Sequence, residues 1–168
     1  EAITGGLFYV DGEKIEIKAV TPLVPVKENE TPEQHARNIK KARAKNVIDQ
    51  AMEYLVAHVY SSLDLIGTWA ESDADILTIL RGDQQVMAGM EHNREAAIKM
   101  EQYLEIQANQ HLPTTMADVQ SKYQGIPYGW REIDIAAVVA MLIYDQKVTI
   151  KYGGSTVQPS DPKLPDML

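Results

Sequence analysis

The stretch from Gly125 to Gly154 constrains the fold more than any other part of the chain. It opens with Gly-Ile-Pro-Tyr-Gly-Trp (125–130), in which proline and glycine favour a tight turn that carries two aromatic rings. The almost wholly apolar segment Ile133–Tyr144 follows, and its length suits a helix buried in a core. Gly153-Gly154 then separates two short runs, as in a β-hairpin with a type I′ turn. A turn, a buried helix and a hairpin in this order predict the second half of a winged-helix-like module.

The composition sets limits on the class of protein. With 168 residues, 45% of them apolar, the chain is long enough to bury a core and to hold one domain or two small ones. The formal net charge of −8 argues against a surface that binds nucleic acid throughout, although a local basic patch could still do so. The absence of cysteine excludes disulfides, thiolate nucleophiles and zinc sites that need sulfur, and it fits a reducing compartment.

No apolar run approaches the length of a membrane span. The longest, Ile135–Tyr144, is far shorter than the roughly 18 to 20 residues that a bilayer requires, so we expect no membrane partner. The first four residues, Glu-Ala-Ile-Thr, lack an initiator Met and the pattern of a signal peptide. We therefore expect a piece of a longer protein.

The N-terminal region predicts a β-hairpin. Two alternating runs, Leu7–Val10 and Glu13–Val20, flank an Asp11-Gly12 pair, which is a strong hairpin indicator. Ile15 and Ile17 share one face of the second run, with charged residues on the other. Because an isolated hairpin is marginal in water, it should pack on helices or join another sheet.

The middle of the chain contains several predicted helix starts. Thr31-Pro32 with Gln34 forms a capping box, and apolar residues at three-and-four spacing extend this helix to Leu63, with Gly67 as its C-cap. Further helices are predicted over 72–80, 93–110 and 115–123, where Ser72 with Asp75 and Thr115 with Asp118 supply the caps.

The fold class is therefore predicted to be α+β and predominantly helical: an N-terminal β-hairpin, a helical middle, and a C-terminal helix-turn-helix with a β-hairpin wing. The predicted segments are a hairpin and linker (1–30), a helical region (31–112), the winged-helix-like module (113–158) and an extended tail (159–168).

Catalytic and cofactor motifs are missing from the sequence. The glycine pairs lack the Lys-Ser/Thr that a phosphate-binding loop requires. The histidines stand singly, without metal-ligand spacing, and no Gly-x-Ser-x-Gly elbow occurs. We expect no catalytic residue, cofactor or metal; a small enzyme remains as a minor alternative. The four histidines are His35, His58, His92 and His111.

Two groups of basic residues are candidates for binding DNA. The cluster Arg37–Lys45 follows several glutamates, and we favour a solvated helix face for it. The wing offers Lys147 and Lys151, with Arg131 at the start of the preceding helix. In a winged helix that helix normally reads the major groove through exposed polar residues, yet here it is apolar and three of its four nearby charges are acidic. Packing in a core, with the wing free for protein contact, is the preferred interpretation.

Six residues are therefore candidates for an interaction surface: Tyr128, Trp130, Arg131, Lys147, Lys151 and Tyr152. For Tyr128 and Trp130, an aromatic pair beside a Pro-Gly turn more often staples helices together than binds a ligand, and we prefer the staple.

The C-terminal portion, with its Tyr-Gln-Gly-Ile-Pro-Tyr-Gly-Trp run (123–130), Glu132–Ala137 and Lys147–Gly154, resembles the C-terminal region of the large P-loop ATPases of bacteriophage exclusion (BREX) defence systems. The segment Leu55–Leu63 is similar to a preceding part of the same proteins. The resemblance implies a parent that hydrolyses ATP, assembles with other defence proteins and acts in the cytoplasm. The nucleotide-binding motifs are absent from this sequence, so no catalytic residue is carried over.

These observations predict a non-catalytic interaction region of a phage-defence ATPase, whose partners are other protein components of a defence complex. The alternative is a DNA-binding winged-helix module that uses Arg131, Lys147 and Lys151. The oligomeric state is left open.

Overall fold

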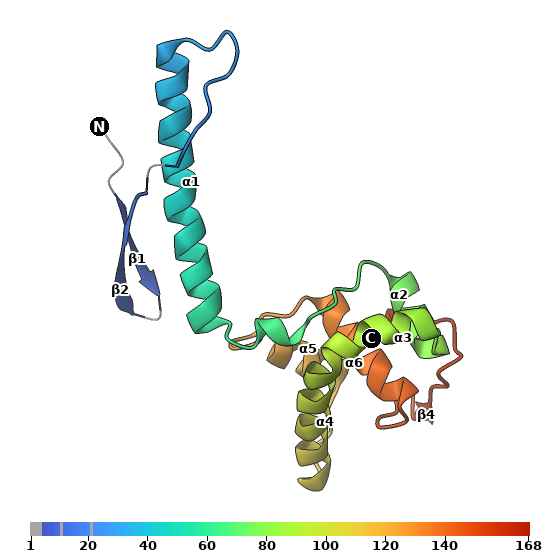
Figure 1. The fold of residues 1–168 in the computed structure, drawn as a ribbon. Helices are drawn as coiled ribbons and strands as arrows, with labels where there is room; N and C mark the ends of the chain where they lie inside the picture. Colours follow the sequence, from blue (N-terminus) through green and yellow to red (C-terminus); the bar gives the residue numbers. More distant parts are fainter. Residues whose placement is uncertain (1–4, 11, 21) are drawn as a thin grey trace. The chain divides into compact units, whose positions relative to one another are not determined.

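The computed structural model describes residues 5–10, 12–20 and 22–168 (Figure 1). Asp11 of the predicted hairpin turn and residues 1–4, on which the prediction of an excised piece rests, lie outside the described residues. The chain forms two compact units, Glu1–Ser61 and Ser62–Leu168, and each is treated by itself below. Helices predominate over two small antiparallel sheets, which confirms the predicted α+β, mostly helical class.

The first unit contains the predicted N-terminal hairpin. Strand β1 (Gly5–Val10) pairs antiparallel with β2 (Glu13–Lys18), and Val10 lies opposite Glu13. Ile17 is buried and Ile15 half-buried, whereas the charged residues between and beside them are exposed. The predicted alternation of faces is thus confirmed.

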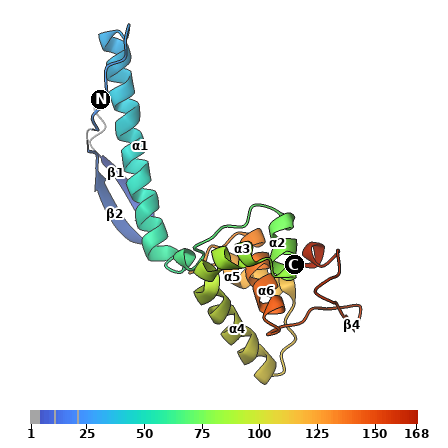
Figure 2. The same cartoon turned by 45° about the vertical axis from the view of Figure 1, so that its right-hand side comes forward.

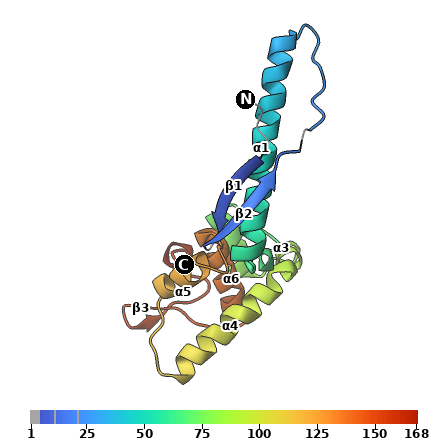
Figure 3. The same ribbon diagram turned by 90° about the vertical axis from the view of Figure 1, so that its left-hand side faces the viewer.

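The hairpin packs against helix α1 (Pro32–Val59), and Figures 1 and 3 show both strands beside this helix. It starts at the predicted capping box, where the Gln34 N–H donates to Thr31 Oγ1 at 3.2 Å and the Thr31 N–H donates to Gln34 Oε1 at 2.9 Å. Val47 is its one buried side chain among the described residues. A Cβ added to Gly6 of β1 would lie 2.8 Å from Val47 Cγ1, so glycine lets the hairpin approach this closely.

The predicted end of this helix was wrong. The sequence prediction extends it to Leu63 with Gly67 as its C-cap, but α1 ends at Val59 and a separate 3₁₀ turn, η1, spans Leu63–Leu65. The apolar spacing continues past Val59 because Leu63 and Leu65 pack on the core of the second unit. The backbone N–H of Ser62 donates to Pro127 O at 3.0 Å instead of continuing the helix.

The second unit is built around α6 (Glu132–Tyr144), the predicted apolar helix. Every residue from Asp134 to Ile143 is buried. Three other helices pack on it, as Figure 2 shows: α2 (Asp73–Arg81), α4 (Arg94–Asn109) and α5 (Met116–Gln124). The remaining elements are α3 (Gln84–Met90) and the 3₁₀ turns η2 (Glu91–Asn93) and η3 (Pro165–Met167).

The predicted helix caps in this unit are confirmed. At the start of α2 the Asp75 carboxylate accepts the Ser72 N–H at 3.1 Å. At the start of α5, Thr115 and Asp118 form a reciprocal capping box. Gly82 ends α2 in the left-handed region, with φ of 71°.

The wing is shorter than the sequence pattern indicates. Strands β3 (Lys151–Tyr152) and β4 (Ser155–Thr156) have two residues each, and the Val157 N–H adds a bond to Ile150 O at 2.8 Å. The φ angles of Gly153 and Gly154, 57° and 83°, are those of the predicted type I′ turn.

The C-terminal tail (159–168), predicted to be extended, instead contains several turns. It contains η3, which contacts α2. Leu164 and Leu168 are both buried in the core of the second unit. Gln120 Nε2 donates to the Leu168 carbonyl at 3.0 Å.

The four-segment division stays a prediction; the structure adds that one compact unit ends at Ser61 and the next begins at Ser62. Among the described residues, no helix combines the length and the hydropathy that crossing a membrane requires.

Candidate interaction surface

The Pro-Tyr-Gly-Trp turn places its aromatic rings in a cluster. The Ile126–Pro127 peptide is cis and Gly129 has φ of 65°. Trp130 is 1% exposed, its ring stacks on Tyr123 with centroids 4.7 Å apart, and its indole N–H donates to Ser62 O at 3.0 Å. The indole is thus part of the core.

The same cluster joins α4, α5 and the turn. The ring of Tyr128, which is half-buried, lies 4.6 Å from that of Tyr123, and Tyr103 of α4 meets Tyr123 edge-on at 6.1 Å. The Nζ of Lys122 lies 4.6 Å from the Tyr103 ring centroid. Burial, and to a smaller extent the neighbouring tyrosines, raise the pKa of Tyr123. This geometry is that of a staple between helices.

Arg131, a predicted interaction residue, forms a bidentate ion pair. Its Nε lies 2.6 Å from Asp134 Oδ2 and its Nη2 lies 2.9 Å from Oδ1, while Nη2 also donates to Ala70 O at 2.8 Å. The hydrogen bond that Arg131 donates to Asp134 is the main cause of the raised pKa of Arg131. The guanidinium also lies over the ring of Trp69, at 4.9 Å. Most of its hydrogen-bonding capacity is therefore committed within the domain.

Two fully buried polar residues fix the segment 66–70 that precedes α2. Asp134 Oδ1 accepts the Ala70 N–H at 2.9 Å. Asn93 Oδ1 accepts the N–H groups of Gly67 and Thr68 at 2.9 and 2.8 Å, and its Nδ2 donates to Thr68 O at 2.8 Å. No sequence pattern indicated a role for Asn93, whereas Asp134, an acidic residue near the start of the apolar helix, forms part of the distinctive motif of the family resemblance together with Pro-Tyr-Gly-Trp. A carboxylate inside an otherwise apolar helix was the available indication for Asp134.

The wing residues differ in their exposure and pairing. Lys147 Nζ lies 2.9 Å from Glu101 Oε1, and this hydrogen bond is the main cause of the raised pKa of Lys147. Lys151 and Tyr152 are exposed, Tyr152 to 70%. Among the described residues Lys151 has no ion pair, so of the three cations in the DNA alternative it alone is uncommitted.

The basic cluster of α1 lies mainly in solvent. Arg37, Lys40, Lys41 and Lys45 are exposed, and Lys45 pairs with Asp49 at 2.5 Å, one helical turn away. This is the arrangement of a solvated helix face.

The second unit carries most of the negative charge of the chain. Residues 62–168 contain fifteen acidic and eight basic side chains, a formal net charge of −7 out of the total of −8. A surface of this sign repels nucleic acid on average. No group of three acidic or histidine side chains with the geometry of a metal site occurs in the ranges 5–10, 12–20 and 22–168.

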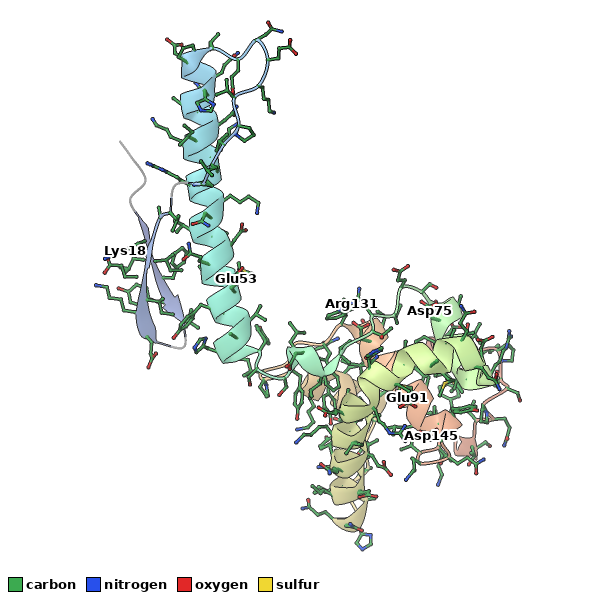
Figure 4. All side chains as sticks on the ribbon, viewed as in Figure 1. Lys18, Glu53, Asp75, Glu91, Arg131 and Asp145 are labelled. Carbon is green, nitrogen blue, oxygen red and sulfur yellow. The ribbon has the colours of Figure 1, made fainter. Side chains whose placement is uncertain are left out.

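A groove runs along α4 and consists of two parts, and the ion pair between Lys147 and Glu101 lines both of them. We call the two parts together the α4 groove. The first part, about 290 Å³, lies between α4, the start of α5, α6 and residues 147–150. The second part, about 220 Å³, lies between α3, α4 and the end of α6. Figure 4 labels Glu91 and Asp145, two acidic residues that line the second part.

The helix-turn-helix formed by α5 and α6, followed by the β3–β4 hairpin, defines a winged helix-turn-helix domain. The family model described as the BREX ATP-binding protein BrxC winged helix-turn-helix domain matches residues 62–168, and the chain belongs to this family. The match coincides with the second compact unit. No solved structure matches the chain. The resemblance to BREX ATPases and the winged-helix fold expected from the sequence are confirmed, and the matched domain is a winged-helix module rather than an ATPase catalytic domain.

Proposed function

We propose that the chain is a non-catalytic interaction region that mediates protein assembly in a BREX phage-defence complex. The observation that carries this proposal is the burial of α6 from Asp134 to Ile143. In a DNA-binding winged helix the corresponding helix enters the major groove with exposed polar side chains. Here α2, α4 and α5 cover it instead.

Charge supports the same proposal. The exposed residues at the start of α6 are Arg131 and Glu132, and Arg131 is paired with Asp134. The net charge of −7 over residues 62–168 opposes approach to a phosphate backbone. Charge therefore favours a protein-binding role for a fold that binds DNA in other proteins. The proposed role is in the cytoplasm and needs no cofactor or metal in this chain.

An assembly experiment tests the proposal. The purified chain is mixed with the other protein components of the defence system and analysed by size-exclusion chromatography with light scattering. We expect a complex of defined stoichiometry. Finding none, under conditions in which the full-length ATPase forms one, would show that assembly depends on other parts of the parent.

DNA binding through the wing is the second candidate, and the exposure of Lys151 and Tyr152 favours it. It predicts binding of duplex DNA through Arg131, Lys147 and Lys151, with an affinity that falls steeply as salt rises. Fluorescence anisotropy with a labelled duplex at low salt measures this directly. The absence of binding there removes the candidate, and binding that the substitution Lys151→Glu abolishes supports it.

A further inference from the structure

The floor of the α4 groove is apolar and open to water. Leu104, Met116, Val148 and Ile150 line its first part and are only partly buried although they pack on the core. Ile98, in the second part, is 46% exposed. Apolar surface that the domain itself leaves uncovered, here on both sides of the Lys147–Glu101 ion pair, is typical of a contact site for another protein.

The rim of the groove is mainly acidic, and two of its carboxylates have no direct hydrogen-bond or ion-pair partner within the described ranges. Glu105 lines the first part and Asp145 the second, and both are exposed. Within the described ranges neither forms a hydrogen bond or a direct ion pair through its side chain. Both act on Lys147, whose ammonium group bonds to Glu101 between them. Two cations line the groove, and each is paired: Lys147 with Glu101 and Arg94 with Glu91. Glu105 and Asp145 are the carboxylates that remain available to a partner, one in each part of the groove.

We propose that the α4 groove binds a cationic amphipathic helix of a partner protein. Apolar side chains of that helix would cover Ile98 and Leu104, and its Lys or Arg residues would pair with Glu105 and Asp145. The distance along α4 from Ile98 to Glu105 is about 10 Å at 1.5 Å per residue, which accommodates roughly two turns of a docked helix. Recognition through anchors at helical spacing is an established way for a groove to bind a helix. This inference rests on the proposed function in assembly and adds the surface and the chemistry of the partner.

The first experiment uses a synthetic probe and the whole 168-residue chain. The probe is a fluorescein-labelled amphipathic peptide of leucine and lysine, about four helical turns long. Two matched peptides replace either every leucine by serine or every lysine by glutamate. Anisotropy titrations should show the leucine–lysine peptide binding at least about tenfold more tightly than either, a difference of roughly 1.4 kcal/mol. Equal binding of the serine–lysine peptide would reduce the interaction to charge alone and overturn the proposal.

Matched variants then locate the binding site. The double variant Glu105→Gln/Asp145→Asn should weaken binding by about five- to tenfold, because it removes two charge-assisted contacts. The control, Asp64→Asn/Asp166→Asn, removes the same charge from exposed positions that do not line the groove. Equal weakening by the two double variants, or none by the first, overturns the proposal.

Ile98→Ser tests the apolar part of the site, at an exposed position where the fold tolerates a change. It should also weaken binding of the leucine–lysine peptide, and circular dichroism verifies that each variant remains folded. Unchanged affinity in a folded Ile98→Ser protein contradicts docking on this floor.

The assembly experiment separates the two proposals. If the chain joins the defence complex and the Glu105→Gln/Asp145→Asn variant joins it equally well, the groove proposal fails while the role in assembly stands. If the wild-type chain joins no complex but the peptide results hold, the role in assembly fails while the groove retains its chemical preference.

Discussion

The guanidinium of Arg131 and the carboxylate of Asp134 form a two-point ion pair at the start of α6, with distances of 2.6 and 2.9 Å. Asp134 is fully buried, whereas 52% of the Arg131 side chain is exposed. The pair also holds both backbone groups of Ala70, the N–H through Asp134 and the carbonyl through Arg131. The pair therefore links the segment before α2 to the central helix α6. Arg131 thus stabilises the fold at a position where a DNA-binding domain would present an unpaired cation.

Replacement of Asp134 by alanine should destabilise the domain by about 3 kcal/mol, because the Ala70 N–H and the guanidinium lose a buried acceptor. Urea denaturation of the whole chain measures this free energy of unfolding. The control is Asp145→Ala at the other end of α6, where the side chain is exposed and the change should stay within about 0.5 kcal/mol. Similar losses in the free energy of unfolding for the two substitutions would mean that the buried ion pair does not stabilise the domain more than an exposed carboxylate does.

Local features of the fold were predictable because their causes lie within a few residues. The capping boxes at Thr31 and Thr115 and the Gly153-Gly154 turn depend on neighbours at fixed spacing. The hydrogen bonds that Ala70 donates to Asp134 and Gly67 donates to Asn93 join residues 64 and 26 positions apart, and no local pattern specifies them.

The candidate surface was predictable only in part. The aromatic turn and the wing were found from the sequence, and so was the apolar character of α6. The α4 groove was not, because it forms where residues from α3 to α6 and the segment 147–150 converge. The end of α1 was misplaced for a related reason: apolar spacing does not reveal that Leu63 and Leu65 serve a different core.

Gly82 and Gly89 should respond in opposite directions to replacement by alanine. Gly82 has φ of 71° and a Cβ there would overlap the ring of Tyr144, so Gly82→Ala should destabilise the protein by more than about 1 kcal/mol. Gly89 lies inside α3 with nothing within 4 Å of an added Cβ, so Gly89→Ala should stabilise it by about 0.5 to 1 kcal/mol. Thermal and urea denaturation of both variants test the pair, and a loss of stability in Gly89→Ala would contradict the placement of α3.

The fluorescence of the two tryptophans should distinguish the buried Trp130 of the aromatic cluster from the exposed Trp69. Trp130 is 1% exposed and Trp69 is 46% exposed. In Trp69→Phe the remaining emission should lie at short wavelength and resist quenching by acrylamide, whereas in Trp130→Phe it should be red-shifted and easily quenched. Equal quenching of the two single-tryptophan proteins would be inconsistent with a buried Trp130.

Stability at alkaline pH should depend on Tyr123. Its pKa is raised above the ordinary value of about 10, mainly by burial, so between these two values the unfolded chain loses a proton that the folded chain keeps. The stabilisation is therefore complete below about pH 10 and is lost as pH rises towards the folded-state pKa. Tyr123→Phe removes this titration together with the hydroxyl bond to Lys99 O at 3.2 Å, which costs about 1 kcal/mol at neutral pH.

Urea denaturation from pH 8 to 11 should show the wild-type free energy of unfolding falling more steeply than that of Tyr123→Phe. The exposed residue Tyr152 provides the control, because Tyr152→Phe should leave the steep wild-type slope unchanged. Parallel slopes for the wild type and Tyr123→Phe would show that burial does not hold the Tyr123 phenol in its neutral form.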